Sequence, residues 1–535
     1  MIEQYTAAMK RDLARGRIDR RQFMQGMVAA GVAIPTAMSM ASSALAAMPK
    51  KGGHFRQALG HGSTTDTLDP ATYENGMQQN VLYCMGNHLT EVDNNGDLVP
   101  ELAESYDASP DARVWTFKLR KGVEFHNGKT MTAEDVIASF NHHRGEDSKS
   151  AVKGVIAGVE NIRKDGDYTV VFELSEGNAD FPYIVSDYHL VIFPATDNGI
   201  DWQSGHGTGG YQIEVYEPGV RAMFKRNPNY WKEGRAHFDS IETLSLLDTT
   251  ARQNAVMNGD VDVINRVDPK TAHLLGRVPT LNLLETTGTL HYTFPMRVDQ
   301  APFDNYDLRM AVKLSVDRDE MVKKILAGRG AVGNDHPIST ANRFHAGDLE
   351  QRSYDPDKAR HHLKKAGMEG ATIELSAADA AFTGAVDAAL LMKASAAKAG
   401  LNIEVVREPS DGYWSNVWNK KAFCACYWGG RPTEDWMFAA AYVADSKWND
   451  TAWTKGASAD KFNALVKEAR AELDQTKRRE MYGECQRLVN DDGGALIPMF
   501  ANYVEGVSTK VAHDENIAAN WELDGNKSGE RWWFA

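Results

Sequence analysis

The most regular alternation of hydrophobic and polar positions lies in the segment 107–140. Trp115, Phe117 and Leu119 occupy every second position, and a threonine and a lysine stand between them. This period of two predicts a strand with one buried face. The segment 168–174 alternates in the same way and predicts a second strand of this kind.

A helix is predicted directly after the first of these strands. Asn127 and Gly128 are a turn-forming pair. Thr132 is followed three residues later by Asp135, which resembles a short capping box. We therefore expect a helix that begins at Thr132 and continues to about residue 140.

Helical periods of three and four residues become frequent in the second half of the chain. Asp355 as N-cap and Pro356 in the first turn predict one helix start, and Gly367 predicts its end. A strand, a helix and a strand in succession predict a partly parallel sheet. That unit consists of a strand at 372–375, a helix at 383–399 and a strand at 403–406. The other elements predicted in this half are helices at 308–326, near 460–473 and near 476–489, and a strand at 495–500.

The composition is that of a folded globular protein. The chain has 535 residues, of which 42% are hydrophobic and 25% are charged, and these are ordinary values. A single hydrophobic core does not extend over so many residues, so we expect two or three domains. The formal net charge of −14 argues against nucleic acids and anionic membranes as partners.

The N-terminal segment resembles an export signal of the twin-arginine type. Arg20, Arg21 and Phe23 stand at the motif positions, and residues 22–49 carry no charge. Asp19 stands where serine or threonine is usual, so the general export route remains open. The 28 uncharged residues are also long enough for a membrane anchor, but their weak hydrophobicity favours a signal peptide.

Ala44-Leu45-Ala46 offers a small-x-small cleavage site, so we expect residues 1–46 to be removed. This leader holds six basic and three acidic residues, and its loss lowers the formal net charge from −14 to −17. The first cysteine is Cys84, so none is available for lipid attachment near the new N-terminus. The expected location is the periplasm, as a free protein exported by the twin-arginine machinery.

The order of short motifs resembles that of the family 5 solute-binding proteins, the extracytoplasmic receptors of peptide, nickel and related ABC importers. The segment 107–140 resembles the family's signature segment, and Arg309 with Asp317 and Arg318 resembles its "Arg-x-Ala…Asp-Arg" helix. The other matching segments are 67–70, 97–106, 207–211, 226–231 and 258–262. The resemblance runs from about residue 52 to about residue 510.

This resemblance implies an α/β fold like that of periplasmic binding proteins, with two lobes, mixed sheets and a hinge, plus an extra small inserted domain. It implies a binding protein without enzymatic activity and without a cofactor. The implied partners are a peptide or small-molecule ligand and the permease and ATPase subunits in the inner membrane, and we expect a monomer. The implied boundaries are 47–91, 207–298 and 499–535 for the first lobe, 92–206 for the inserted domain and 299–498 for the second lobe.

Half of the twelve tryptophans lie between Tyr413 and Trp453. Aromatic side chains with a few polar groups are typical of small-molecule sites at domain interfaces. Tryptophan is also highly buried on average, so we expect two or three of these rings to contact a ligand. The candidate ligand-binding residues are Glu74, Trp414, Trp428, Gly429, Arg431, Glu434, Asp435, Trp436, Trp448 and Asn449.

Arg431 is the clearest departure from the family pattern. It stands where peptide-binding members carry an aspartate that pairs with the ammonium group of the peptide. At about 4 Å and an effective dielectric of about 20, this reversal replaces an attraction of ~4 kcal/mol by a repulsion of similar size. Three alternatives follow: Glu434 or Asp435 takes over the ammonium group, Arg431 binds a carboxylate or phosphate, or Arg431 pairs with one of these two acidic residues.

Two other functions compete with that of an organic-solute receptor. A nickel, metal-chelate or haem-type receptor of the same family is compatible with sixteen histidines, although no histidine spacing demands it. A secreted hydrolase lacks support, because the sequence contains neither Gly-x-Ser-x-Gly nor His-Glu-x-x-His. No metal ligands are predicted, and buried free thiols are expected at Cys84, Cys424, Cys426 and Cys485.

Overall fold

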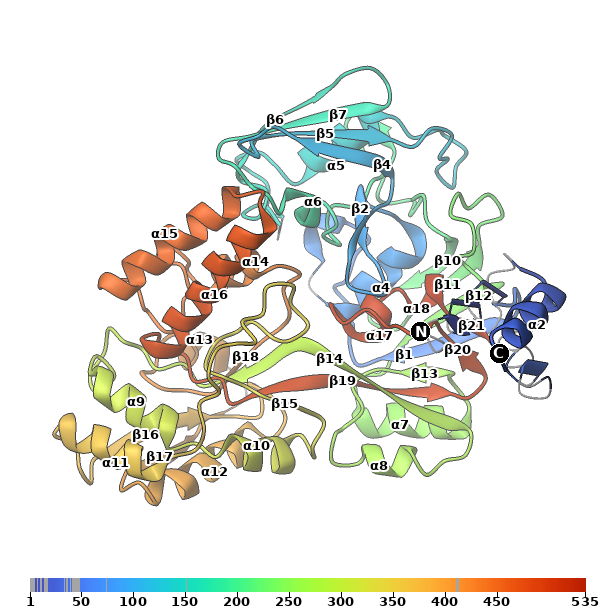
Figure 1. The fold of residues 1–535 in the computed structure, drawn as a ribbon. Coiled ribbons are helices and arrows are strands. Elements are labelled where there is room, and N and C mark those ends of the chain that lie inside the picture. Colours follow the sequence, from blue (N-terminus) through green and yellow to red (C-terminus); the bar gives the residue numbers. More distant parts are fainter. Residues whose placement is uncertain are drawn as a thin grey trace.

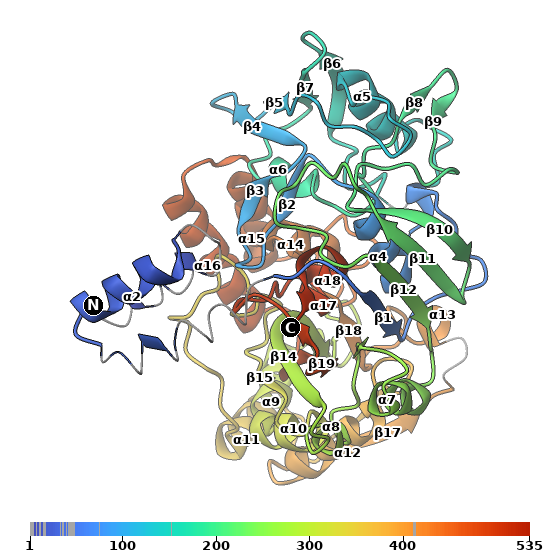
Figure 2. The ribbon, with the colours of Figure 1, turned by 90° about the vertical axis from the view of Figure 1, so that its right-hand side faces the viewer.

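The computed structural model of the protein describes residues 5–6, 8–9, 12–13, 18–32, 34, 37–38, 40, 49–73, 75–150, 152–409 and 413–535. A nine-stranded mixed sheet passes through the two lobes, and a separate four-stranded sheet lies at one end of the molecule (Figures 1 and 2). This is the mixed α/β, two-lobed architecture that the resemblance implied. The residue boundaries between its domains stay a prediction.

Two long antiparallel strands connect the lobes. They are β14 (Leu281–Thr293) and β19 (Met499–Ser508). At one end of this pair, β19 continues through β13 (Val263–Ile264) into the sheet of the first lobe. At the other end, the pair is flanked by the second lobe's strands β15 (Gly330–Val332) and β18 (Cys426–Trp428). The connection between the lobes is therefore a two-stranded ribbon (Figure 1).

The first lobe completes the large sheet on the far side of β13. Parallel pairing of β1 with its two neighbours places the first strand of the described body at the centre of this lobe. A stacked pair of rings, Phe55 and Phe238 with centroids 4.3 Å apart, lies in its core. The strands, in spatial order, are β10 (Tyr211–Glu217), β11 (Arg221–Arg226), β12 (Ser240–Ser245) and β1 (His54–Leu59).

The small domain confirms the strand and helix predicted from the segment 107–140. Trp115, Phe117 and Leu119 are buried on one face of β5, and Val114 and Lys118 are exposed on the other. This domain has its own hydrophobic core, which is separate from those of the lobes. Its elements are the antiparallel strands β4 (Ala103–Ala108), β5 (Val114–Leu119), β7 (Thr169–Leu174) and β6 (Val159–Lys164) and the helix α5 (Ala133–His142).

The predicted capping box is present at the start of α5. The backbone N–H of Thr132 donates to the Asp135 carboxylate at 2.9 Å, and the Thr132 hydroxyl lies 3.2 Å from the same oxygen. The Asp135 carboxylate also accepts from the backbone N–H of Ala195 at 2.7 Å. It therefore joins the helix start to the segment that leaves the small domain.

The second lobe confirms the predicted strand–helix–strand unit. The strand β16 (Thr372–Ala377) pairs in parallel with β17 (Asn402–Arg407), and α12 (Ala385–Ala397) connects them. Asp355 caps α11 (Pro356–Lys365) by accepting from the backbone N–H of Lys358. The other two predicted helices of this lobe are α15 (Ala457–Ala471) and α16 (Gln475–Asp491).

Two predicted elements of the second lobe differ from the structure. The single helix expected at 308–326 is two helices, α9 (Tyr306–Leu314) and α10 (Arg318–Ile325). The break occurs because Asp317 is an N-cap, whose carboxylate accepts from the backbone N–H of Glu320 at 2.9 Å. The strand expected at 495–500 begins only at Met499. The residues before it form hydrogen bonds outside the sheet, since the backbone N–H of Ile497 donates to the Asp335 carboxylate.

The export motif lies on a short helix, α2 (Arg20–Ala29), that projects from the rest of the molecule (Figure 2). Phe23 is fully buried in a local cluster with Leu13, Met27 and Ala37. The predicted cleavage site lies outside the described residues. Within the described parts of the chain, none of the helices combines the length and the apolar character needed to cross a bilayer. All four cysteines are buried and free, as predicted.

Candidate ligand-binding cleft

A cavity of about 370 Å³ lies between the two lobes. Its lining comes from the first lobe, from β14 of the ribbon, from Tyr183 of the small domain and from two loops of the second lobe. A volume of this size is typical of small-molecule sites. The lining residues are Val92, Asn95, Gly96, Tyr183, Thr287, Thr289, Thr340, Ala341, Asn342, Arg431, Pro432, Ile517, Ala519 and Asn520.

A β-bulge places two threonines of the ribbon in this cavity. The register between β14 and β19 shifts between Thr287 and His291, and a bulge of this kind re-aims side chains. Gly288 lies inside the bulge, where an added Cβ would stand 2.3 Å from the ring of Tyr503. Only glycine fits there, and its two neighbours, Thr287 and Thr289, line the cavity.

A second cavity of about 210 Å³ adjoins the first and shares Thr287 and Thr340 with it. His336 and His345 line this second cavity. Burial lowers the pKa of His336 to about 3 and also lowers the pKa of His345. Both imidazoles are therefore neutral at pH 7.

Among the described residues, Arg431 is the only charged one that lines either cavity. Its Nη1 donates to two carbonyl oxygens of its own loop, Gly430 at 3.1 Å and Gly429 at 3.3 Å. Its guanidinium carbon lies 5.9 Å from the centre of the Trp428 ring. In the described part of the chain, no carboxylate oxygen comes within 4.0 Å of the Arg431 guanidinium. Burial lowers the pKa of Arg431, but a guanidinium still stays protonated at pH 7.

The two acidic residues that could have replaced the family's aspartate are engaged elsewhere. The Glu434 carboxylate accepts from the backbone N–H of Phe344 at 2.6 Å, and burial raises its pKa. Asp435 pairs with Arg470 at 3.0 Å, and burial raises its pKa to about 6. Neither residue lines the cavity that holds Arg431.

A family model for bacterial extracellular solute-binding proteins, family 5, matches residues 97–450. The chain belongs to this family. Di/tripeptide-binding protein 1 of Pseudomonas aeruginosa is 26% identical over 492 residues, which cover 84% of this chain and 90% of the relative.

Two solved structures resemble the fold of this family 5 protein. One is the periplasmic binding protein DppA of Helicobacter pylori in complex with the peptide STSA, with a TM-score of 0.74, 20% identity, and coverage of 91% of this chain and 99% of that one. The other is AgaA of A. tumefaciens R10 in complex with agropinic acid, with a TM-score of 0.74, 23% identity, and coverage of 90% and 99%.

Four tryptophans of the family 5 chain form a continuous run of contacting rings, Trp414, Trp418, Trp428 and Trp448, but none of the four lines the cavity between the lobes. Trp428 is 7% exposed and donates from its ring nitrogen to the Asp450 carboxylate at 3.2 Å, and Trp418 donates to the same oxygen at 2.9 Å. Trp414 and Trp448 are 40% and 53% exposed. Trp428 reaches the cavity only indirectly, through its contact with Arg431.

A third cavity, of about 570 Å³, contains three other predicted residues. Trp436, Trp448 and Asp435 line it, together with residues of the small domain. Asn449 is buried, and its side-chain amide donates to the carbonyl oxygen of Tyr442 at 3.0 Å beyond the end of α14 (Glu434–Ala441). Glu74 lies outside the described residues.

The described members of the predicted set are therefore divided among different environments, and among them Arg431 lines the cavity between the lobes. The sequence-based prediction missed Tyr183, Thr287, Thr289, Asn342 and Asn520. One local signal pointed to two of them, because Gly288 interrupts a strand between threonines, and glycine inside a strand indicates a bulge or a close approach. The other three carry no local signal.

One carboxylate cluster has the geometry of a metal site. Among the described residues, only Glu91, Glu101 and Glu530 bring three possible metal-ligand atoms within 4.8 Å of one another. Lys232 occupies their centre, with its Nζ 3.1, 2.6 and 3.1 Å from the three carboxylates.

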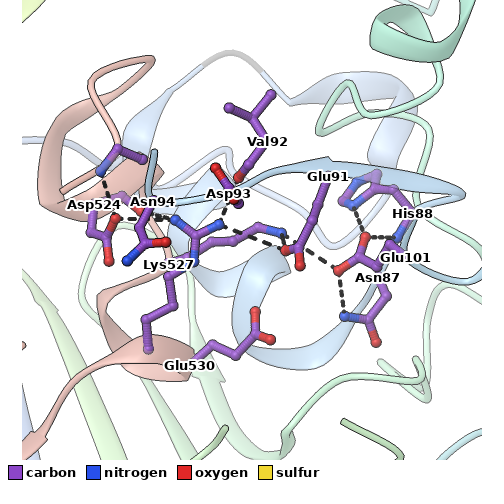
Figure 3. Close-up of polar contacts among 12 residues, drawn as sticks. Asn87, His88, Glu91, Val92, Asp93, Asn94, Glu101, Asp524, Lys527 and Glu530 are labelled. Atoms are coloured by element: carbon purple, nitrogen blue, oxygen red, sulfur yellow. Dashed lines mark hydrogen bonds and ion pairs between the residues drawn. The ribbon is translucent and has the colours of Figure 1, made fainter. Parts of the chain in front are cut away.

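Lys527 also contacts this cluster, at 2.5 Å from Glu91 and 3.5 Å from Glu101 (Figure 3). The two lysines hold the pKa of Glu101 well below its usual range, although burial acts in the opposite direction. The cluster is an ion-pair network that joins the C-terminal segment to Glu91 and Glu101, and the Nζ of Lys232 already stands among the three carboxylates.

Proposed function

We propose that this protein captures a peptide or another small polar organic solute between its two lobes and delivers it to the permease of an ABC importer. The observation that carries the proposal is the interlobe cavity, whose lining combines first-lobe residues such as Asn520 with second-lobe residues such as Arg431. The family and its di/tripeptide-binding relative support a ligand of this class.

The mechanism requires only that the ligand contacts both lobes. A ligand shifts the equilibrium toward the closed form by the difference between its affinities for the closed and open forms. In this chain, that difference would come from contacts that Thr287 and Asn520 make on one side and Asn342 and Arg431 on the other. The β14–β19 ribbon would absorb the hinge rotation.

We further propose that the protein acts in the periplasm after export by the twin-arginine machinery. The motif residues Arg20 and Arg21, the uncharged segment 22–49 and the absence of cysteine before Cys84 support this route and a protein without a lipid anchor. Its partners there are the permease and ATPase subunits, and no bond of the solute is broken. The export route, the location and the partners are proposals that go beyond the family assignment.

The proposal is tested by calorimetry and small-angle X-ray scattering on the purified mature chain. A panel of dipeptides, tripeptides and organic acids should contain a solute that binds and lowers the radius of gyration. Mass spectrometry should recover that solute unchanged after prolonged incubation, whereas a hydrolysed product would establish an enzyme. Elemental analysis of the protein as purified would reveal a metal-chelate receptor by a stoichiometric metal. Binding without any compaction would contradict the two-lobe mechanism.

A further inference from the structure

We propose that the cleft selects a singly charged organic carboxylate and that Arg431 is the residue that binds the carboxylate group. The inference rests on the proposed function and specifies its ligand. It also states what the cleft rejects, which is a solute that presents a free ammonium group near Arg431. Four features of the cleft support it: its charge, the Arg431 guanidinium, the neutral polar groups and the acidic neighbours.

The first feature is the charge of the lining. In the part of the chain that the structure describes, no aspartate or glutamate lines either of the two adjoining cavities. Arg431 contributes one positive charge, and the histidines of the second cavity are neutral because burial lowers their pKa. The cleft is therefore a positive site in a chain whose formal net charge is −14. A buried ligand charge must be compensated, and here only one negative charge can be.

The second feature is the guanidinium of Arg431 and the donors that it keeps free. The hydrogen bonds of the Arg431 guanidinium to the described residues are both made by Nη1, at 3.1 and 3.3 Å, and both go to carbonyl oxygens of its own loop. By contrast, Arg470 and Arg478, which contact the small domain from the same lobe, pair with Asp435 and Asp180. Arg431 thus keeps donors in the fork geometry that matches a carboxylate.

The third feature is the set of neutral polar side chains around the Arg431 guanidinium. Thr287, Thr289 and Thr340 supply hydroxyls, and Asn342 supplies an amide that is held near the loop by a 3.5 Å contact with the carbonyl oxygen of Arg431. In the adjoining cavity, His336 is 2% exposed, and its Nδ1 has no hydrogen-bond partner among the described residues. An unpaired buried nitrogen is costly unless a ligand or water bonds to it.

The fourth feature is that the described lining offers no carboxylate to an ammonium group. Asp435 is bound to Arg470, and Glu434 is bound to the backbone N–H of Phe344. The loop cannot easily move to present them, because an added Cβ at Gly430 would stand 1.6 Å from Oγ1 of Thr289 and the loop is packed directly on β14. Asp187 acts electrostatically on Arg431, but its carboxylate is bonded to His189 at 2.6 Å and is not among the described lining residues. An ammonium group at this position would therefore face the guanidinium with no carboxylate of the described lining beside it.

Four dialanine derivatives of nearly equal size test the inference by calorimetry on the mature chain. They are N-acetyl-dialanine, dialanine, dialaninamide and N-acetyl-dialaninamide, which are anionic, zwitterionic, cationic and neutral. We expect N-acetyl-dialanine to bind at least tenfold more tightly than dialaninamide. Arg431→Gln should remove this preference, Arg431→Lys should keep part of it, and Arg431→Asp should weaken binding of the anion by at least tenfold and favour the cation.

Arg407→Gln is the matched control, since Arg407 is exposed on β17 and lines none of the three cavities. It removes the same charge and should leave the order of the four probes unchanged. The inference is overturned if the cation or zwitterion binds as tightly as the anion, or if Arg431→Gln retains the preference. Compaction in scattering with those probes would then leave the proposed function intact. If none of the four binds or compacts the protein, the inference and peptide capture both fall.

Discussion

Arg431 and Arg478 are two arginines of the second lobe that face the other half of the molecule, and they differ in one respect. Arg478 is 1% exposed, and its guanidinium lies 2.6 Å from the carboxylate of Asp180 in the small domain. Asp180 also accepts from Arg343 at 3.2 Å. Arg431 has no such partner in the described chain and lines a cavity instead.

The comparison shows how the partner of a buried charge indicates its role. A paired, desolvated charge belongs to the fold, because removal of one partner leaves the other uncompensated. A charge that lines a cavity without a partner contributes little to the fold and is available to a ligand. Substitution of Arg478 should therefore affect mainly stability, whereas substitution of Arg431 should affect mainly ligand binding.

The largest effect is expected from Lys232→Met, which tests the same rule in the first lobe. The buried carboxylates of Glu101 and Glu530 lose their main cation. The free energy of unfolding should therefore fall by an amount near the upper end of ~3–5 kcal/mol. The change is measured by urea unfolding at pH 7. A loss below about 1 kcal/mol would mean that Lys527 alone neutralises the cluster.

The same cluster has a defined pH dependence. The folded-state pKa of Glu101 and of Glu91 lies below the unfolded value. Their contribution to stability is therefore present above a pH of about 4.3 and is lost as the pH falls through the folded pKa values. In Lys232→Met the acid unfolding midpoint should move to higher pH, which a circular dichroism titration records.

Arg478→Ala should have the next largest effect. Asp180 stays buried but keeps Arg343, so we expect a loss of roughly 3 kcal/mol in the free energy of unfolding. Its sequence neighbour Arg479 is exposed and provides the control, for which Arg479→Ala should cost less than about 1 kcal/mol. Equal losses in the two variants would contradict the role given to the Asp180 pair.

A smaller effect with a different pH dependence is expected at Glu505 of β19. Glu505 is 1% exposed, one carboxylate oxygen has no partner among the described residues, and burial raises its pKa to about 8. The folded state therefore holds a proton that the unfolded state releases, so this residue lowers stability as the pH rises from about 4.3 to 8.

Glu505→Gln should remove that loss, because glutamine keeps an acceptor for the backbone N–H of Leu523 and carries no charge. We expect the variant to be more stable at pH 9 by roughly 1–3 kcal/mol and nearly unchanged at pH 5. Melting temperatures measured at both pH values give the difference. A gain that is equal at pH 5 and pH 9 would indicate a packing effect instead.

The smallest effect on stability is expected from Arg431→Gln. With no ion pair to break, the free energy of unfolding should change by less than about 1 kcal/mol. Together with the loss of binding described above, this result would show that Arg431 serves ligand binding and Arg478 serves stability. A destabilisation as large as that of Arg478→Ala would place Arg431 in the fold.

The local sequence pattern predicted the elements of the small domain well. Alternation at Trp115, Phe117 and Leu119 and the pair Thr132 and Asp135 act over a few residues, and the structure has the same strand face and the same cap. The prediction of one helix over 308–326 was wrong because the period continued through Asp317, whose capping role outweighed it. Periodicity reports which face is buried, and a single capping hydrogen bond decides where a helix begins.

By itself, the sequence determined the family, the mixed α/β class and the unusual charge at residue 431, because ordered motifs and residue identity are properties of the chain. Only the tertiary structure decided that Glu434 and Asp435 are engaged elsewhere and that most of the tryptophans are not in the cleft. It also brought Thr287, Asn342 and Asn520 together from three distant segments. The physical reason is that a charge's effect depends on which groups lie within a few ångströms of it, and long-range packing sets those neighbours.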